Sequence, residues 1–317
     1  MSVDEAFEQK DNSWAVSLAP HLRTGVTTRK VMLSVILALT PQLIYSVFTF
    51  GFNAFLLILL SVCSCVFFEA MTQKAFKKPL QITDLSAVVT GILLAYNLPA
   101  SAPWWLPIVG GFFAMAIVKE FFGGIGQNFV NPALAARATL MISWPTIMTN
   151  YVGPDGMTGA TPLQIMKGAE GTLPELKAML IGNIGGVLGE TAKVLLLIGF
   201  LYLAIKQILD WRITVVYVAT TMLMLFVQGV TGMNLLYHLF GGGLILGACF
   251  MATDFVTAPI SKSGKIIFAV GCGLLTALIR VRGGMAEGVS YSILIMNCFV
   301  PLIDRLTRPR IFGEARK

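Results

Sequence analysis

The chain contains a long apolar run, FNAFLLILLSVCSCVFFEAM, at residues 52–71. A helix needs about 20 mostly apolar residues to cross the hydrocarbon core of a bilayer, and Glu69 is the one charged residue in this run. Over the whole chain, 56% of the residues are hydrophobic and 12% are charged, and the mean hydropathy is +0.78. Soluble domains carry roughly 25% charged residues. The sequence therefore predicts an integral membrane protein.

Apolar runs of this kind recur along the chain and predict ten transmembrane helices. They are separated by charged residues, Pro or Gly, and they cover residues 31–50, 52–71, 83–98, 104–122, 131–146, 188–208, 212–230, 239–255, 265–281 and 286–303. Runs 83–98 and 131–146 are short for a full crossing, so we expect tilted, broken or partly re-entrant helices there. No strand-like alternation of the outer-membrane barrel type competes. The predicted fold class is an all-α polytopic membrane protein.

Basic residues lie mainly in alternate connections between these runs. They are Arg23, Arg29, Lys30, Lys74, Lys77, Lys78, Lys119, Arg137, Lys206, Arg212, Lys262, Lys265, Arg305, Arg308, Arg310, Arg316 and Lys317. Because Lys and Arg are enriched in cytoplasmic loops, we expect both termini in the cytoplasm and loop 147–187 on the outer face of the cell inner membrane. The net charge of +7 then reflects orientation in the membrane, and no nucleic-acid partner is expected.

The two halves of the chain show a faint but ordered similarity. Ala95-Tyr96-Asn97-Leu98 corresponds to Ala252-Thr253-Asp254-Phe255, and Gly123–Asn128 corresponds to Gly283–Gly288. Each half holds five predicted spans, so the second half starts from the opposite membrane face and the repeats are inverted. We expect broken helices at the Gly-rich segments and a binding site between the halves. The alternative is that two apolar, Gly-containing halves resemble one another by composition alone.

These patterns divide the chain into five parts. We expect a cytoplasmic tail at 1–30, a first five-helix repeat at 31–146, an extracytoplasmic loop at 147–187, a second repeat at 188–303 and a cytoplasmic tail at 304–317.

Loop 147–187 contains the segment Asp155-Gly156-Met157-Thr158-Gly159-Ala160-Thr161-Pro162. Long structured loops are often functional, and a threonine hydroxyl among small residues is a candidate site for a phosphoester. The simpler interpretation is a turn that leads into a helix, with Thr161 as the N-cap and Pro162 at the first helical position. The spacing alone favours this capped turn.

The same segment resembles the D-G-x-[S/T]-G-A-T signature recognised by flavin transferases. In the NqrB/RnfD family of respiratory membrane subunits, the last threonine of that signature carries FMN through a phosphoester. Further blocks resemble that family in the same order, from about residue 25 to 310. They are Gly123–Leu134 with Arg137-Ala138, Phe250–Asp254 with Gly264-Lys265, Leu278–Val281 and Pro301–Asp304. Thr158 replaces a frequent Ser and keeps the hydroxyl.

The resemblance implies the cofactor and the residues that hold it. Thr161 is expected to anchor covalent FMN, while Asp155, Thr158, Gly159 and Ala160 shape the turn that holds the phosphate and admits the transferase. Arg137 lies either near an anionic flavin or at a helix end among lipid headgroups. Asp254 is expected at a second, noncovalent flavin such as riboflavin, or on an ion path. No catalytic residue is assigned.

Other ionisable residues lie in or near the predicted spans, where charge is costly and commonly functional. They are Glu69, Lys119, Glu120, Glu190, Lys193 and Arg280. Most lie near predicted helix ends and could reach the membrane interface by snorkelling. The five cysteines lack metal-binding spacing, so no metal site is expected.

The resemblance thus implies an electron-transfer subunit of an ion-translocating complex. The short segment before the first span favours the Rnf branch, a ferredoxin:NAD oxidoreductase that moves Na⁺ or H⁺, over the Na⁺-translocating NADH:quinone reductase. No nucleotide-binding motif follows a predicted strand, so nucleotide and iron–sulfur chemistry is expected in partner membrane, flavin and iron–sulfur subunits. The alternative from another class is a urea-transporter-like solute channel. A solute channel does not require the D-G-x-[S/T]-G-A-T segment, so this segment favours the flavin-carrying subunit over the channel.

Overall fold

The computed structural model describes residues 26–285 and 287–308. Within these residues the chain forms helices and two isolated bridges, Pro99 with Val187 and Val152 with Thr158, and no strand. The all-α prediction is therefore confirmed. Most of the two expected tails, 1–30 and 304–317, lies outside the described residues; the remainder joins α1, which begins at Thr28, and α14, which ends at Leu306.

The N-terminal half contains two long helices followed by shorter ones. They are α1 (Thr28–Phe50), α2 (Phe52–Ala75), the 3-10 turn η2 (Ile82–Asp84), α3 (Ser86–Tyr96), α4 (Leu106–Phe112), the π-helix η3 (Phe113–Glu120) and α5 (Pro132–Ser143). α5 starts where Asn131 accepts hydrogen bonds from the backbone N–H groups of Ala133 and Leu134. Pro132 follows at the first helical position, where its missing N–H costs nothing.

The connecting loop and the C-terminal half repeat this mixture of long and short helices. The loop carries α7 (Pro162–Met166) and α8 (Leu176–Ile181). The short helix α6 (Pro145–Met148) lies at its start, and η4 (Leu188–Glu190) directly follows it. The C-terminal half contains α9 (Lys193–Ile205), α10 (Trp211–Val227), α11 (Met233–Phe240), α12 (Leu244–Leu246), the π-helix η5 (Gly247–Met251), α13 (Lys262–Arg282) and α14 (Val289–Leu306). A bend of 57° separates α11 from the segment Leu244–Met251.

Four of the helices in the described part of the chain are long and apolar enough to cross a membrane. They are α1, α2, α13 and α14, and the bent pair of α11 with Leu244–Met251 makes a fifth if it is one span. This composition supports a multi-pass membrane protein. A helix lies in each of the ten predicted runs, but α3, α9 and α10 are shorter than a full span by this criterion, and the ten-span count stays a prediction.

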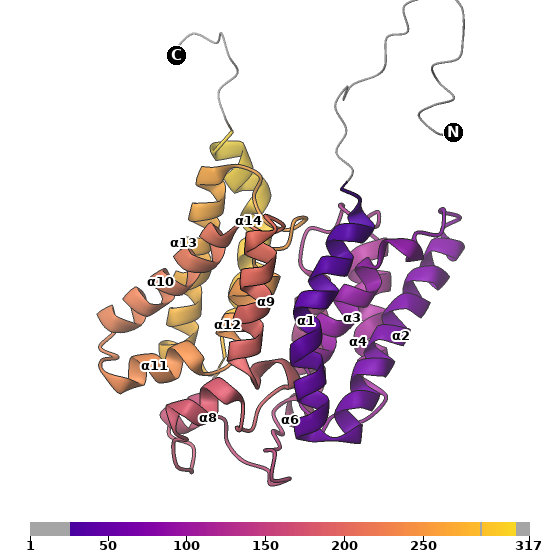
Figure 1. Cartoon of the computed structure of the whole chain (residues 1–317). Helices are drawn as coiled ribbons and strands as arrows, with labels where there is room; N and C mark the ends of the chain where they lie inside the picture. Colours follow the sequence, from indigo (N-terminus) through magenta and orange to yellow (C-terminus); the bar gives the residue numbers. More distant parts are fainter. Residues whose placement is uncertain (1–25, 286, 309–317) are drawn as a thin grey trace, which may run out of the picture.

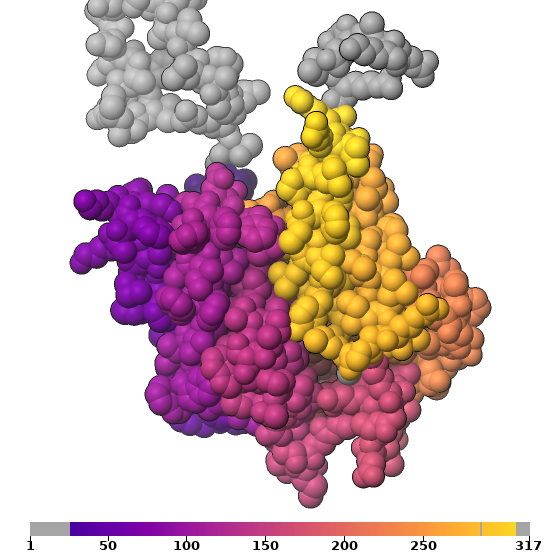
Figure 2. Space-filling model, turned by 180° about the vertical axis from the view of Figure 1, so that it is seen from behind, coloured from indigo at the N-terminus to yellow at the C-terminus, as the bar shows by residue number. Residues whose placement is uncertain are grey.

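The two halves pack side by side, with the 147–187 loop at one end. Figure 1 shows α6 and α8 at the end of the molecule opposite the start of α1 and the finish of α14. α1 packs against α9, and α5 packs against α14. From behind, the yellow residues, which include α14, lie against the magenta part of the N-terminal half, with the pink loop below (Figure 2). The loop and the two halves together line one cavity.

Six ionisable residues that the sequence places near helix ends are buried inside the protein. They are Glu69, Lys119, Glu120, Glu190, Lys193 and Arg280, none more than 7% exposed. Their side chains therefore do not extend to the membrane interface, as the snorkelling interpretation expected. Lys119, for example, pairs with Glu69 of α2 and donates a hydrogen bond to Ser86 at the start of α3 (2.6 Å). The charge on Lys119 is thus satisfied by contacts between helices.

Gly199 tests the contact between the halves. Its α-carbon faces the backbone carbonyl of Ala38, and a side chain there would overlap that carbonyl. Gly199→Val should force α1 and α9 apart and destabilise the fold by about 1–3 kcal/mol, the usual cost of overpacking. Thermal unfolding in detergent should show a lower midpoint, whereas Leu201→Val, at a position 58% exposed, should change it little. An unchanged midpoint for Gly199→Val would contradict the close packing.

Candidate functional site

Thr161 lies where the loop turns into α7. Its hydroxyl oxygen accepts a hydrogen bond from the backbone N–H of Gln164 (3.3 Å), and the Gln164 side chain accepts one from the Thr161 N–H (2.8 Å). This reciprocal arrangement is a capping box, and Pro162 occupies the first helical position. The N-cap interpretation of Thr161 is therefore confirmed. Thr161 is only 8% exposed.

The preceding turn points away from the protein. Gly156 has a φ of +76°, which a residue with a side chain rarely adopts. The Asp155 carboxylate accepts a hydrogen bond from the Met157 N–H (3.3 Å), and Gly153 N–H donates to the Met157 carbonyl (2.8 Å). Asp155, Thr158 and Gly159 are exposed. Of the two threonines in this segment, Thr158 is accessible and Thr161 is buried.

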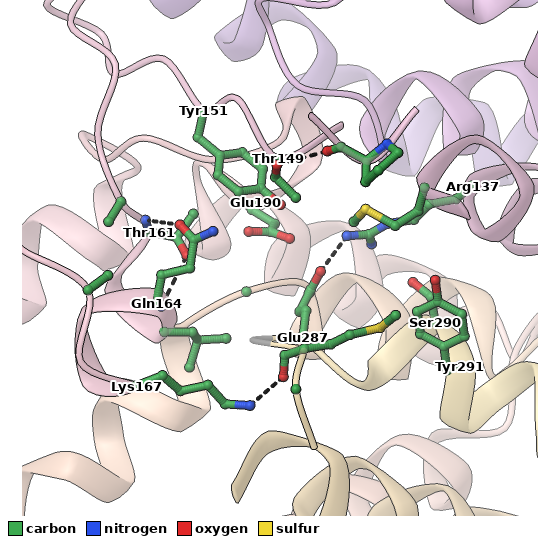
Figure 3. A pocket seen from close by; sticks show the side chains of 18 of the residues that line it. Arg137, Thr149, Tyr151, Thr161, Gln164, Lys167, Glu190, Glu287, Ser290 and Tyr291 are labelled. Carbon is green, nitrogen blue, oxygen red and sulfur yellow. Dashed lines mark hydrogen bonds and ion pairs between the residues drawn. The ribbon is translucent and has the colours of Figure 1, made fainter. Parts of the chain in front are cut away.

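Thr161 lines a cavity of about 650 Å³ between the loop and the two halves. Figure 3 shows Thr161, Gln164 and Lys167 on one side of it and Arg137, Ser290 and Tyr291 on the other. Ala160 also lines the cavity, whereas Asp155, Thr158 and Gly159 do not. Ligand cavities commonly measure about 300–1,000 Å³, so this one is large enough for a cofactor.

Arg137 is buried within the protein and lies inside α5, so the structure does not place it at a helix end. One guanidinium nitrogen donates to the Asn97 side chain (2.8 Å), and another pairs with the carboxylate of Glu287, which precedes α14. The backbone N–H of Gly243 also donates to Glu287. The ion pair therefore joins the break after α3, α5, the start of α12 and the start of α14.

Glu190 and Tyr151 complete the wall beside Arg137. Glu190 is 7% exposed and lines the cavity, while the buried ammonium of Lys193 donates to the Glu190 backbone carbonyl. Burial, reinforced by the negative charge of Glu190, raises the pKa of the Tyr151 phenol. Tyr151 therefore stays neutral and can present a hydroxyl donor to the cavity.

Lys167 ties the loop to the C-terminal half. Its ammonium donates hydrogen bonds to the carbonyl of Gly283 (2.6 Å) and to that of Met285, shortly before Glu287 in the chain. Leu163, 3% exposed, packs over Gly241 and Gly242, where a side chain on either glycine would meet it. These contacts close the loop over the cavity.

Asp254 lies in a different cavity, of about 110 Å³. That cavity is also lined by Lys119, Asn128 and Asn131, and Asp254 accepts a hydrogen bond from Thr257 (3.0 Å). Asn131 caps the start of α5, and Arg137 lies farther along the same helix. α5 therefore connects the Asp254 cavity to the Thr161 cavity.

The residues around Thr161 fit FMN. Arg137 and Lys167 supply positive charge for a phosphodiester, and Tyr151, Leu163 and Tyr291 supply aromatic and apolar surface for a ring system.

The sequence analysis did not predict several residues of this cavity, among them Glu287, Lys167, Tyr151, Gln164 and Tyr291. A local signal for Gln164 was present, because Thr-x-x-Gln is a capping-box pattern. Glu287 and Lys167 reach the cavity through contacts distant in sequence, which no local pattern signals.

A sequence model described as the NQR2, RnfD, RnfE family matches residues 15–313. The chain belongs to this family. The resemblance found in its motifs is thereby confirmed.

Individual members of the family are similar over nearly their whole length. One, from Acetobacterium woodii, is named as the D subunit of a Na⁺-translocating ferredoxin:NAD⁺ oxidoreductase complex; it is 48% identical over 95% of this chain and 96% of its own. Another, from Clostridium ljungdahlii, is named as the D subunit of a proton-translocating ferredoxin:NAD⁺ oxidoreductase complex and is 43% identical over 97% of this chain and 98% of its own. A third, from Stutzerimonas stutzeri, is named as the D subunit of an ion-translocating oxidoreductase complex. It is 38% identical over 90% of this chain and 92% of its own.

The ion pair at the cavity makes a direct prediction. Arg137→Met leaves Glu287 without its cation, and removing one partner of a buried pair costs about 3–5 kcal/mol. The thermal midpoint in detergent should fall strongly, and the double variant Arg137→Met/Glu287→Gln should regain part of the loss. Arg282→Met, at an exposed position of α13, is the matched control. Additive effects of the two single substitutions would argue against the pair.

Proposed function

We propose that this chain is the D subunit of an ion-translocating ferredoxin:NAD oxidoreductase complex and carries FMN joined to Thr161 by a phosphoester. The observation that supports it most is that the threonine of the flavin-transferase signature opens onto a cavity of about 650 Å³. Relatives named as the D subunit of such complexes match the chain over nearly its full length. Those names also favour this branch over the NADH:quinone reductase.

The protein's part in this function is placement and electrostatics. FMN, when bound, supplies the electron-accepting ring. Thr161 fixes one end of the cofactor, Arg137 and Lys167 offset phosphate charge, and Asp155, Thr158, Gly159 and Ala160 form the accessible turn by which a transferase recognises the site. The chain is thus an electron relay that depends on its complex for turnover.

The cavity around Asp254 is our proposed place for a second, noncovalent flavin such as riboflavin, or for part of an ion path. Lys119, Asn128 and Asn131 line it together with Asp254, and the side-chain nitrogens of these three residues also donate hydrogen bonds within the protein. At about 110 Å³ the cavity is below the usual range for organic ligands, so a flavin would have to widen it, whereas an ion would not.

We infer ten transmembrane segments arranged as two inverted repeats. Of the five pairs of spans that such a symmetry relates, the first and the last, α1 with α9 and α5 with α14, are in contact, as expected for elements beside a two-fold axis. With basic residues on the alternate connections, both termini face the cytoplasm and the flavin loop lies outside the inner membrane. Partner membrane, flavin and iron–sulfur subunits supply the nucleotide and cluster chemistry.

Thr161→Ala tests the flavin attachment. Protein coexpressed with a flavin transferase should fluoresce under ultraviolet light on a denaturing gel and should gain the mass of a phosphoester-linked FMN. Thr161→Ala should lose both signals, because no other hydroxyl of the signature faces the cavity. Thr158→Ala, at the exposed position, should keep the attachment at Thr161. A dark wild-type band, or fluorescence retained in Thr161→Ala, would overturn the proposal.

A further inference from the structure

We propose that the first turn of α14 receives the polar edge of the flavin ring, with the hydroxyl groups of Ser290 and Tyr291 as hydrogen-bond donors to it. This inference rests on the proposed attachment of FMN at Thr161, and it assigns a role to two side chains that the attachment itself does not require. Its basis is a pair of hydroxyl groups at the cavity that the protein leaves without partners.

Ser290 and Tyr291 are neighbours at the start of α14, and both line the Thr161 cavity. Ser290 is 6% exposed and Tyr291 is partly buried, and Figure 3 shows them together on the wall opposite Thr161. Within the residues that the structure describes, neither hydroxyl forms a hydrogen bond, and that of Tyr291 is fully buried. A buried hydroxyl without a partner is costly, so this wall lacks an acceptor that a bound ligand can supply.

The next hydroxyl along α14 is satisfied within the protein. The Ser292 hydroxyl is hydrogen-bonded to those of Thr276 (2.7 Å) and Tyr217 (3.0 Å) in the packed core. The two hydroxyls of α14 that line the cavity therefore differ from the one that points into the core. This difference indicates that their partner comes from the cavity.

The beginning of α14 also favours an electron-rich ligand. Gly288 occupies the N-cap position and provides no side chain to cap the helix. The first N–H groups of a helix have no carbonyl partner within it, and they give this end a partial positive charge. The preceding carboxylate, that of Glu287, is turned to Arg137 and to the Gly243 N–H. An acceptor that carries partial negative charge therefore fits this end of α14.

The flavin ring carries such acceptors along one edge. Its pyrimidine edge has carbonyl oxygens and ring nitrogens, whereas its opposite edge is apolar. A cofactor joined to Thr161 through its phosphate has the ring at its other end, which directs the ring to the wall where Ser290 and Tyr291 lie. Ala138 and Met141 also line the cavity and supply apolar surface for the rest of the ring.

Hydrogen bonds to the polar edge should raise the midpoint potential of the flavin. Reduction increases the electron density on this edge, and a hydrogen bond donated to a more negative acceptor is stronger. Ser290 and Tyr291 should therefore stabilise the reduced ring more than the oxidised one.

Spectroelectrochemistry of the full-length, flavinylated protein, after removal of free flavin, tests this assignment. Tyr291→Phe and Ser290→Ala should each lower the midpoint potential of the covalent flavin. The expected shift corresponds to about a two- to tenfold change in the ratio of reduced to oxidised flavin, the usual net value of one hydrogen bond. Tyr202→Phe, which removes the same atom from α9 outside the cavity, should leave the potential unchanged.

Flavin-free protein provides a second measurement. In the Thr161→Ala background, Tyr291→Phe should leave the thermal midpoint in detergent unchanged or slightly higher, because the hydroxyl has no partner to lose. In the flavinylated protein the same substitution should lower the thermal midpoint. A lower midpoint in the flavin-free background would show that the protein itself holds this hydroxyl, and it would overturn the inference.

Unchanged potentials in both Tyr291→Phe and Ser290→Ala would also overturn the inference, while leaving the attachment at Thr161 intact. Gel fluorescence under ultraviolet light is recorded first on every sample. A wild type without covalent flavin would overturn both the proposed function and this inference.

Discussion

The ion pair between Arg137 and Glu287 is the interaction on which the site depends. Apolar surroundings make an unpaired charge very costly, so α5 and the segment before α14 must come together if either residue is to be buried. Asn97 and Gly243 supply the remaining hydrogen bonds and bring in the helix breaks after α3 and before α12. Four segments from both halves of the chain thus meet at one pair of charges, and the wall of the Thr161 cavity is built around it.

The loop completes the cavity because the opposing backbone has small residues where it docks. Gly241 and Gly242 leave room for Leu163, and Gly243 leaves room for the Glu287 carboxylate. Lys167 then joins the loop to the carbonyls that precede Glu287. The segment that carries Thr161 is therefore positioned by backbone next to the Arg137–Glu287 ion pair. A substitution that disrupts the ion pair should also displace this segment.

Much of this arrangement could be predicted from the sequence where the determining contacts are local. The apolar runs predicted the helices, and Thr161-Pro162 predicted the N-cap, because hydropathy and capping act over a few neighbouring residues. The motif order also predicted the family. The partners of the buried charges were not predictable in this way: Glu190, Lys193 and Arg280 looked like residues near helix ends, and their burial depends on which helices pack together. Glu287 and Lys167 reach the cavity through contacts with residues more than a hundred positions away.

The central claim is that the flavin on Thr161 occupies the cavity bounded by Arg137 and Glu287. A cryo-electron microscopy map of the flavinylated protein within its complex tests it most directly. We expect density continuous with the Thr161 hydroxyl oxygen that enters this cavity, with Leu163 and Lys167 docked as they are here. Density that leaves Thr161 and extends away from Arg137 and Glu287, with the cavity empty of flavin, would contradict the account.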